Sequence, residues 1–299
     1  MGSEARARAR TQARIASKAG TNTKAANARQ RVSAQRAAQL RVHARRRLLL
    51  SAAAIGAVLA TVLVFVTVKL TSGLGASTTE SAATSGVVRQ VTTVPAAVLA
   101  RVHGGRAITP LQTVSRPGPV LSVDGKPAIV FVSEESCPFC AAERWPLVVA
   151  LSHFGSWSQL GVTKSAATDI FPNTATLSFR TARYQSTRLT LHTTELTDNA
   201  GHQLQALSAL DRQLIGRYDV PPYVNSADQS GAMPFLDIGN RYVLAGAQYD
   251  PQVLAGLSAA QIAAQLRNPS SPVAQAIDGS AKVIITAINQ VLHDQAGQG

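Results

Sequence analysis

An uncharged apolar segment divides this chain into two parts that face different surroundings. Residues 48–68 read LLLSAAAIGAVLATVLVFVTV and contain no charge. A helix of this length, rising about 1.5 Å per residue, would span about 31 Å, close to the thickness of the bilayer hydrocarbon. Three arginines (45 to 47) precede it, and Lys69 is the only charge close behind. The positive-inside rule predicts a single-pass protein of the cell membrane, with a cytoplasmic N-terminus and an extracytoplasmic C-terminal part.

Two alternatives to a membrane anchor remain for this segment. It could be a buried core helix, or the apolar part of a cleaved signal peptide, since Gly75, Ala76 and Ser77 are small enough for a cleavage site. The apolar run is long for a signal peptide, and a tail of 47 residues precedes it. A retained transmembrane helix is therefore the favoured interpretation.

The positive charge of the chain is concentrated in the N-terminal tail. The formal net charge is +13, and residues 1–47 contain 13 Lys and Arg against one Glu. The tail has no aromatic residue on which bases could stack and too few aliphatic residues to bury a core, which predicts a disordered cytoplasmic tail. Contact with anionic lipid headgroups is favoured, and specific binding of nucleic acid is not expected. A solvated tail that only sets topology is the alternative.

The rest of the chain reads as a linker followed by one mixed α/β domain. Residues 69–90 are rich in Ser, Thr, Gly and Ala, which predicts a flexible linker, and residues 91–299 form the extracytoplasmic domain. The continuous apolar run Ala128–Val132 predicts a strand buried on both faces. A helix is predicted from Cys137 to Phe154, and another from His202 to Tyr218. We therefore expect a central sheet with flanking helices.

The two cysteines of the chain, Cys137 and Cys140, lie at the junction of the predicted buried strand and helix. Two cysteines exclude a disulfide-dense scaffold and a four-cysteine zinc site. At the N-cap, free backbone N–H groups and the helix dipole would stabilise a Cys137 thiolate. That thiolate could attack a disulfide of a partner, and Cys140 could resolve the mixed disulfide. Pro138 fixes φ in the first turn, where its missing N–H has no helical partner.

The cysteine pair allows two other interpretations, a zinc site and a purely structural disulfide. Zinc would need further ligands, and the histidines of the outer part form no pair at ligand spacing, so neither a metal nor another cofactor is expected. A purely structural disulfide is possible, but so small a ring constrains little of the unfolded chain. Redox activity is the favoured interpretation.

Four features of the chain resemble the thioredoxin-like superfamily. They are the strand AIVFV, the motif Cys137-Pro138-Phe139-Cys140, a proline within the following helix (Pro146) and the later pair Met233-Pro234. The resemblance implies a thioredoxin-like central sheet with flanking helices and an insertion before Pro234. It also implies that the bond before Pro234 is cis and that Met233 and Pro234 bind substrate backbone beside the cysteines. The chain departs from thioredoxins at Ser136, where they carry Trp, and at Phe131, where they carry a buried acid.

A narrower resemblance is carried by SCPFCAAERWPLVVALSHFG (Ser136–Gly155), Tyr184-Gln185-Ser186 and Glu195. These residues resemble the domain of unknown function 929 family over roughly residues 90–292. The residues that support the motif are Pro138, Phe139, Glu143, Arg144 and Trp145. Glu143 and Arg144 lie one turn from the cysteines and could pair with groups in the insertion, and Trp145 is expected in the core. Glu134 and Glu135 would oppose a Cys137 thiolate if they lay close to it, or are solvated loop charges.

The predicted function is that of a membrane-anchored thiol–disulfide oxidoreductase acting on exported proteins, with Cys137 as nucleophile and Cys140 as resolving thiol. Its partners would be protein thiols and disulfides, and membrane lipid through residues 48–68 and the basic tail; the redox partner is not identified. The direction stays open between oxidase, isomerase and reductase. The alternative is a non-catalytic thioredoxin-like binding or scaffold module with a structural disulfide.

Overall fold

The computed structural model describes residues 76–105, 107–224 and 230–297. The predicted tail (residues 1–47) and transmembrane segment (residues 48–68) lie outside these ranges and stay predictions. Among the described residues, no helix combines the length and the apolar character needed to cross a bilayer.

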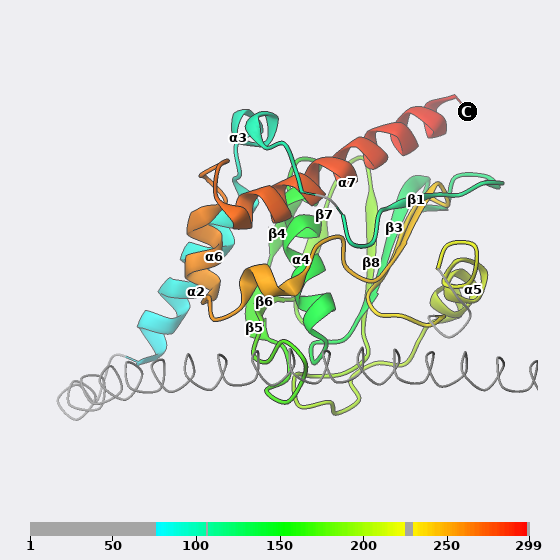
Figure 1. The fold of residues 1–299 in the computed structure, drawn as a ribbon. Coiled ribbons are helices and arrows are strands. Elements are labelled where there is room, and N and C mark those ends of the chain that lie inside the picture. The colour runs from blue at the N-terminus through cyan, green and yellow to red at the C-terminus, as the bar shows by residue number, and fades with distance from the viewer. Residues whose placement is uncertain (1–75, 106, 225–229, 298–299) are drawn as a thin grey trace, which may run out of the picture. The chain divides into compact units, whose positions relative to one another are not determined.

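A mixed six-stranded sheet forms the centre of the described part (Figure 1). Strand β3 (Lys126–Ser133) pairs in parallel with β8 (Thr190–Glu195) and antiparallel with β9 (Phe235–Ile238). Strands β10 (Tyr242–Ala245) and β1 (Gln112–Thr113) continue the sheet beyond β9, and β2 (Ser122–Val123) pairs with the start of β3. The prediction of a mixed α/β domain with a central sheet is confirmed.

Strand β3 contributes to two separate cores because its side chains alternate between the faces of the sheet. Ile129 and Phe131 belong to the larger core, which helices α4 (Pro138–Leu151) and α7 (Pro272–Ala296) cover. Val130 and Val132 belong to a smaller core, which helix α5 (Ala209–Tyr218) covers. The continuous apolar run therefore marks a strand buried on both faces, as predicted.

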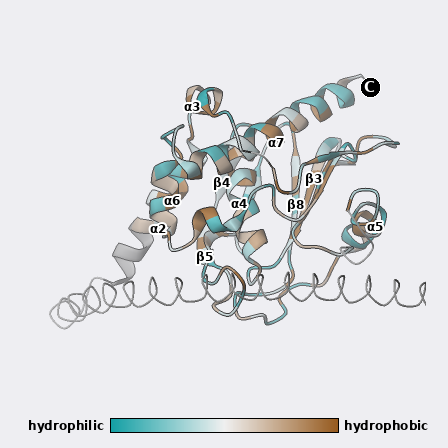
Figure 2. Ribbon diagram, in the orientation of Figure 1, coloured by the Kyte–Doolittle hydropathy of each residue, from teal (hydrophilic) through white to brown (hydrophobic). Residues whose placement is uncertain are grey.

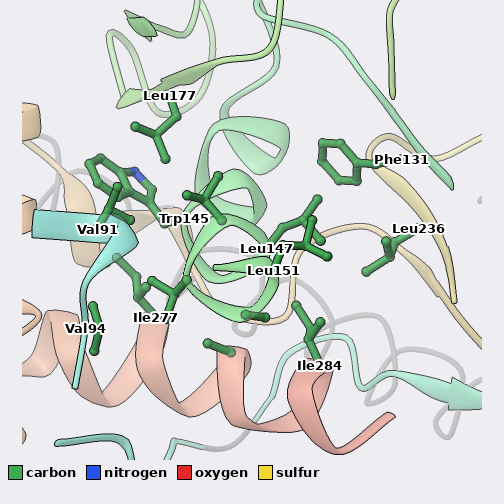
Figure 3. Packing of buried hydrophobic residues seen from close by; sticks show 14 of the residues in the cluster. Val91, Val94, Phe131, Trp145, Leu147, Leu151, Leu177, Leu236, Ile277 and Ile284 are labelled. Atoms are coloured by element: carbon green, nitrogen blue, oxygen red, sulfur yellow. The ribbon is translucent and has the colours of Figure 1, made fainter. Parts of the chain in front are cut away.

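Helices α4 and α7 each contribute seven buried side chains to the larger core. Hydrophobic and hydrophilic residues alternate along α7, as expected of a helix with one buried face (Figure 2). Its side chains Ile277 and Ile284 point toward α4, where Trp145, Leu147 and Leu151 are fully buried (Figure 3). This packing fixes α4, and with it the cysteines at its N-terminus, against the sheet.

The insertion between Cys140 and Pro234 adds two small ribbons that were not predicted. Strand β4 (Ser156–Ser158) pairs with β7 (Arg183–Gln185), and β5 (Gly161–Lys164) pairs with β6 (Ala175–Ser178). The remaining described elements are α3 (Ala96–Arg101), the 3-10 helix η2 (Pro251–Leu254) and α6 (Ala259–Gln265). The insertion thus supplies β8, a strand at the edge of the main sheet that pairs with β3, and ribbons that contact α4.

Two predictions about secondary structure were wrong. Residues 76–92 form helix α2 (Ala76–Thr92) where a flexible linker was predicted to residue 90, because Val87 and Val91, one turn apart, are buried in the larger core. The helix predicted from His202 begins only at Ala209. There Ser208 and Asp211 form a capping box, which ends the extended segment before it.

A close contact between two glycines fixes α7 against the loop after α3. A Cβ atom on Gly279 would lie 2.7 Å from the Cα atom of Gly104. We expect Gly279→Ala to lower the free energy of unfolding by about 1–3 kcal/mol, because the helix would have to shift. Gly216→Ala in α5 is the matched control, because nothing lies within 4 Å of its new Cβ, and we expect it to raise stability by about 0.5–1 kcal/mol. Urea denaturation of both variants measures the difference; equal effects would contradict the contact.

Candidate functional site

Cys137 is the N-cap of helix α4, as the sequence predicted. Its backbone is extended (φ −79°, ψ 125°), and its Sγ accepts a hydrogen bond from the Cys140 backbone N–H at 3.3 Å. Pro138 occupies the first turn. The sulfur of Cys137 thus takes the place of the oxygen of an ordinary capping residue, and it faces the positive end of the helix dipole.

The two thiols of the motif differ in exposure and in acidity. Cys137 is half-buried and Cys140 is fully buried, and both are free thiols in this structure. A hydrogen bond from the Cys140 side chain lowers the pKa of Cys137 against the effect of burial, and the backbone N–H groups of Cys140 and Phe139 lower it further. Burial raises the pKa of Cys140 well above its usual value. The outer thiol is therefore suited to attack and the inner thiol is held in reserve.

This difference predicts selective alkylation. Iodoacetamide near neutral pH should modify Cys137 and leave Cys140 unmodified in the folded chain, because the thiolate is the reacting form and only Cys137 is accessible to the reagent. Peptide mass spectrometry measures the site of modification. Denatured protein, in which both cysteines should react, is the control. Equal labelling of both cysteines in the folded chain would contradict the assignment.

The Met233-Pro234 segment lies against the cysteine motif. The peptide bond between these residues is cis, as the thioredoxin-like resemblance implies. The Cys137 thiol donates to the Met233 carbonyl oxygen at 3.8 Å, and Pro234 accepts a hydrogen bond from the Gly246 N–H. The structure thus brings together residues 96 positions apart in the sequence, Cys137 and Met233.

A cavity of about 610 Å³ lies beside the motif, and Phe139 and Met233 are among its lining residues. None of the described residues that line it is charged. The loop between β5 and β6 borders the motif as well, because the Ala166 N–H donates to the Ser136 carbonyl and the Phe139 ring contacts the Phe171 ring edge-on at 5.8 Å. The insertion therefore contacts the motif and also packs against helix α4 through the Ala175 carbonyl, which accepts from Trp145.

Arg144 forms a buried ion pair with the insertion, as one of the sequence expectations proposed. Its Nη2 and Nε donate to the two carboxylate oxygens of Glu195 at 2.6 and 3.1 Å. Ser133, at the end of β3, donates to Glu195 at 2.8 Å and accepts from Arg144 at 3.3 Å. The role of Ser133 was missed by the sequence analysis, since a serine that ends a strand carries no signal of its own.

Glu143 and Trp145 have other partners. Glu143 accepts from the backbone N–H and the side-chain amide of Gln248, which lies after Pro234 and not in the insertion. Burial raises the pKa of Glu143 to about 7, against the hydrogen bonds from Gln248. Trp145 is fully buried, as expected, and its indole N–H donates to the Ala175 carbonyl at 3.0 Å.

Helix α4 runs through Pro146, which cannot donate to the carbonyl of Ala142. The hydroxyl of Tyr249 donates to that carbonyl at 2.7 Å. A side chain from outside the helix therefore satisfies the carbonyl that the proline leaves free.

Of the two acidic residues before the motif, Glu135 is buried and paired. Glu135 is 2% exposed, accepts a hydrogen bond from Ser178 and lies 3.9 Å from Arg180. The backbone N–H of Glu134 donates to the Cys140 sulfur at 3.4 Å. Glu135 is thus neither a solvated loop charge nor unpaired, and both residues help to hold the turn that precedes α4.

Helix α4 is held by three residues of the narrower resemblance that lie far from the cysteine motif in the sequence, Tyr184, Ser186 and Glu195. The Tyr184 hydroxyl donates to the Leu151 carbonyl and the Ser186 hydroxyl donates to the Phe154 carbonyl. The first bond satisfies the carbonyl of the last helical residue, and the second holds the turn that follows the helix. Glu195 holds the middle of the same helix through Arg144.

Comparison with known proteins gave one match. The model of a family described as "Domain of unknown function (DUF929)" matches residues 118–290, which include the cysteine motif, the insertion and the Met233-Pro234 segment. Neither the curated proteins nor the solved structures contain a match. Across the described ranges, no group of three or more His, Cys, Asp or Glu side chains is placed to hold a metal ion.

Proposed function

The chain belongs to the domain of unknown function 929 family, and from that premise we propose that it is a membrane-anchored thiol–disulfide oxidoreductase that acts on exported proteins. The observation that carries the proposal is the state of Cys137. It caps a helix, its pKa is lowered, and it lies beside a cavity whose described lining residues carry no charge, with the buried Cys140 behind it. Such a pair can exchange disulfides with a polypeptide that reaches the outer thiol.

The exchange has two steps that balance in atoms and electrons. The Cys137 thiolate attacks one sulfur of a substrate disulfide, and the other substrate sulfur leaves as a thiolate that takes a proton from solvent. Cys140 then gives its proton to solvent and attacks Cys137, which forms the Cys137–Cys140 disulfide and releases the second substrate thiolate. The substrate disulfide is reduced by two electrons and the cysteine pair is oxidised by two. The reverse sequence would deliver a disulfide to a reduced substrate.

The proposal includes a thioredoxin-like fold and a location outside the cytoplasm. The fold is supported by a buried strand that leads into a CxxC helix, by a cis-proline segment beside the motif, and by the hairpin β9–β10 that follows it. The location is supported by the apolar segment of residues 48–68 and the arginines before it. A disulfide persists in an oxidising compartment, which suits this placement.

Turnover of a disulfide-bonded protein substrate by the full-length chain tests the proposal. We expect the wild-type chain to exchange thiols and disulfides with reduced or oxidised ribonuclease. Equilibration in glutathione buffers then gives the direction, because a reduction potential near about −120 mV marks an oxidant and one near about −270 mV a reductant. A chain without turnover in either direction, whose disulfide resists mild reductant, would instead be a scaffold module with a structural disulfide.

A further inference from the structure

A buried cation lies beneath the inner thiol of the motif. Arg144 has no exposed surface, although an arginine is almost never fully buried unless paired. It lies four residues after Cys140 in α4, so both side chains are on the same side of the helix. Cys140 is also fully buried. The inner thiol and the guanidinium are therefore both buried on one side of the helix.

The hydrogen bonds of Arg144 leave one of its nitrogen atoms unused. Glu195 and Ser133 accept from Nε and Nη2. The face of the guanidinium lies over the Phe179 ring, 5.9 Å from its centroid. Within the described part of the chain, the buried Nη1 has no hydrogen-bond partner. Leaving a buried charged donor without a partner is unfavourable, so the free Nη1 is available to interact with a negative charge that forms nearby.

The proposed exchange creates a negative charge at this place in one step only. When Cys137 is bonded to the substrate, Cys140 must lose its proton before it can attack. A thiolate in a water-free site is unfavourable unless a positive charge lies close to it. Burial has the larger effect and raises the pKa of the Cys140 thiol. The positive charge of Arg144 acts in the opposite direction and lowers it.

We propose that Arg144, fixed by Glu195 and Ser133, is a positioning residue that stabilises the Cys140 thiolate during resolution of the mixed disulfide. The inference rests on the proposed function. It gives the Arg144–Glu195 ion pair, which joins α4 to the insertion, the role of stabilising the thiolate that resolves the mixed disulfide. Glu195 holds the guanidinium in place and at the same time offsets part of its charge. Removing the cation and removing the acid should therefore have opposite effects on Cys140.

The test follows both steps with one probe, the aromatic disulfide dithiobis(nitrobenzoate), on the full-length chain in detergent micelles. The reduced chain should release a first coloured thiolate when Cys137 attacks and a second when Cys140 resolves. In Arg144→Met/Glu195→Met, which removes both charges, the second release should slow at least about tenfold at pH 7, and the midpoint of its pH profile should rise by about one unit. Glu195→Gln keeps the cation and should move this midpoint downward.

Two further variants separate the charge from packing. Arg144→Lys keeps a positive charge but cannot form the two-nitrogen pair with Glu195, so it should restore only part of the rate of the second release that Arg144→Met/Glu195→Met loses. Arg241→Met/Asp294→Met removes another ion pair, at the opposite end of the β9–β10 hairpin, and should leave both releases unchanged. If the midpoint of the second release is the same in wild type and in Arg144→Met/Glu195→Met, or moves in the same direction in Glu195→Gln, the inference is wrong.

The outcome for this inference is distinct from the outcome for the proposed function. The small aromatic disulfide reports on the chemistry of the two cysteines whether or not protein substrates bind. A chain that turns over ribonuclease but shows no effect of Arg144 would keep its function and lose the inference. The midpoint of the second release could shift in opposite directions in Arg144→Met/Glu195→Met and Glu195→Gln while no protein disulfide is exchanged. In that case the inference about Cys140 would stand and the proposed function would be wrong.

Discussion

Replacing Cys137 by Ser should reduce turnover of a protein disulfide to the uncatalysed level. The serine hydroxyl cannot form the mixed disulfide on which both steps depend. The fold should survive, because serine is a favoured N-cap residue and its oxygen can accept the Cys140 N–H bond that Cys137 Sγ accepts now. Turnover and urea denaturation of the same preparation therefore separate lost chemistry from lost structure.

Cys140→Ser is the matched control for this result. Cys137 should still attack, but the mixed disulfide should accumulate, because no second thiol resolves it. Gel electrophoresis without reductant would detect the trapped species. If Cys137→Ser turned over the substrate at the wild-type rate, another group would be responsible and the proposed function would fail.

Asp278→Asn should stabilise the chain at neutral and alkaline pH and have little effect near pH 4. Asp278 has no exposed surface, and within the described part of the chain neither of its carboxylate oxygens has a hydrogen-bond partner. Burial raises its pKa from the ordinary value of 3.8 to about 7. At about 1.4 kcal/mol for each pKa unit, the ionised carboxylate costs about 4 kcal/mol in the folded chain.

The sign of this effect follows from proton binding. In the unfolded chain Asp278 ionises near pH 4, and in the folded chain only near pH 7. Between these values the folded state binds more protons at Asp278, so the contribution of Asp278 to the stability of the wild type falls as the pH rises and is constant above about pH 7.

Denaturation in urea at several pH values measures the effect. The advantage of Asp278→Asn should grow from near zero at about pH 4 to about 4 kcal/mol above about pH 7. Asp124→Asn, at an exposed turn, is the control and should show no such growth. An advantage that is independent of pH would mean that the folded carboxyl ionises at its ordinary pH.

The local parts of the site could be predicted because they depend on neighbours in the sequence. The Cys137 cap requires only the next three residues, and the burial of β3 on both faces follows from its unbroken apolar run. The hairpin turn at Gly239 and Asn240 follows from residues that tolerate positive φ. The approach of Met233 to Cys137 came from a resemblance and not from local pattern.

The contacts around the cysteines could not be predicted from local pattern because they join distant segments. Glu195 lies 51 residues after Arg144, and Gln248 lies 105 residues after Glu143. The sequence shows that a charged residue follows the motif, but a charge on a helix is usually solvated. Glu195 comes within hydrogen-bond distance of Arg144 only because β8 pairs with β3, so the ion pair could be identified only from the tertiary structure.

The composition of residues 69–90 was similarly misleading. Ser, Thr, Gly and Ala favour a flexible segment when no other contacts exist, and that preference is worth little per residue. Val87 and Val91 gain more by leaving water when the larger core is there to receive them. The helix from Ala76 therefore depends on a partner surface that the segment itself does not contain.

The sequence alone determined where the two cysteine sulfurs lie along the chain, which of them caps the helix, and which strand leads to them. The tertiary structure decided that Cys140 is buried, that Arg144 and Glu195 lie beside each other beneath it, and that the insertion borders the motif. Turns, caps and burial patterns depend on residues within a few positions of one another. The electrostatic environment of a buried group depends instead on which distant segments exclude water from it and which charges they bring.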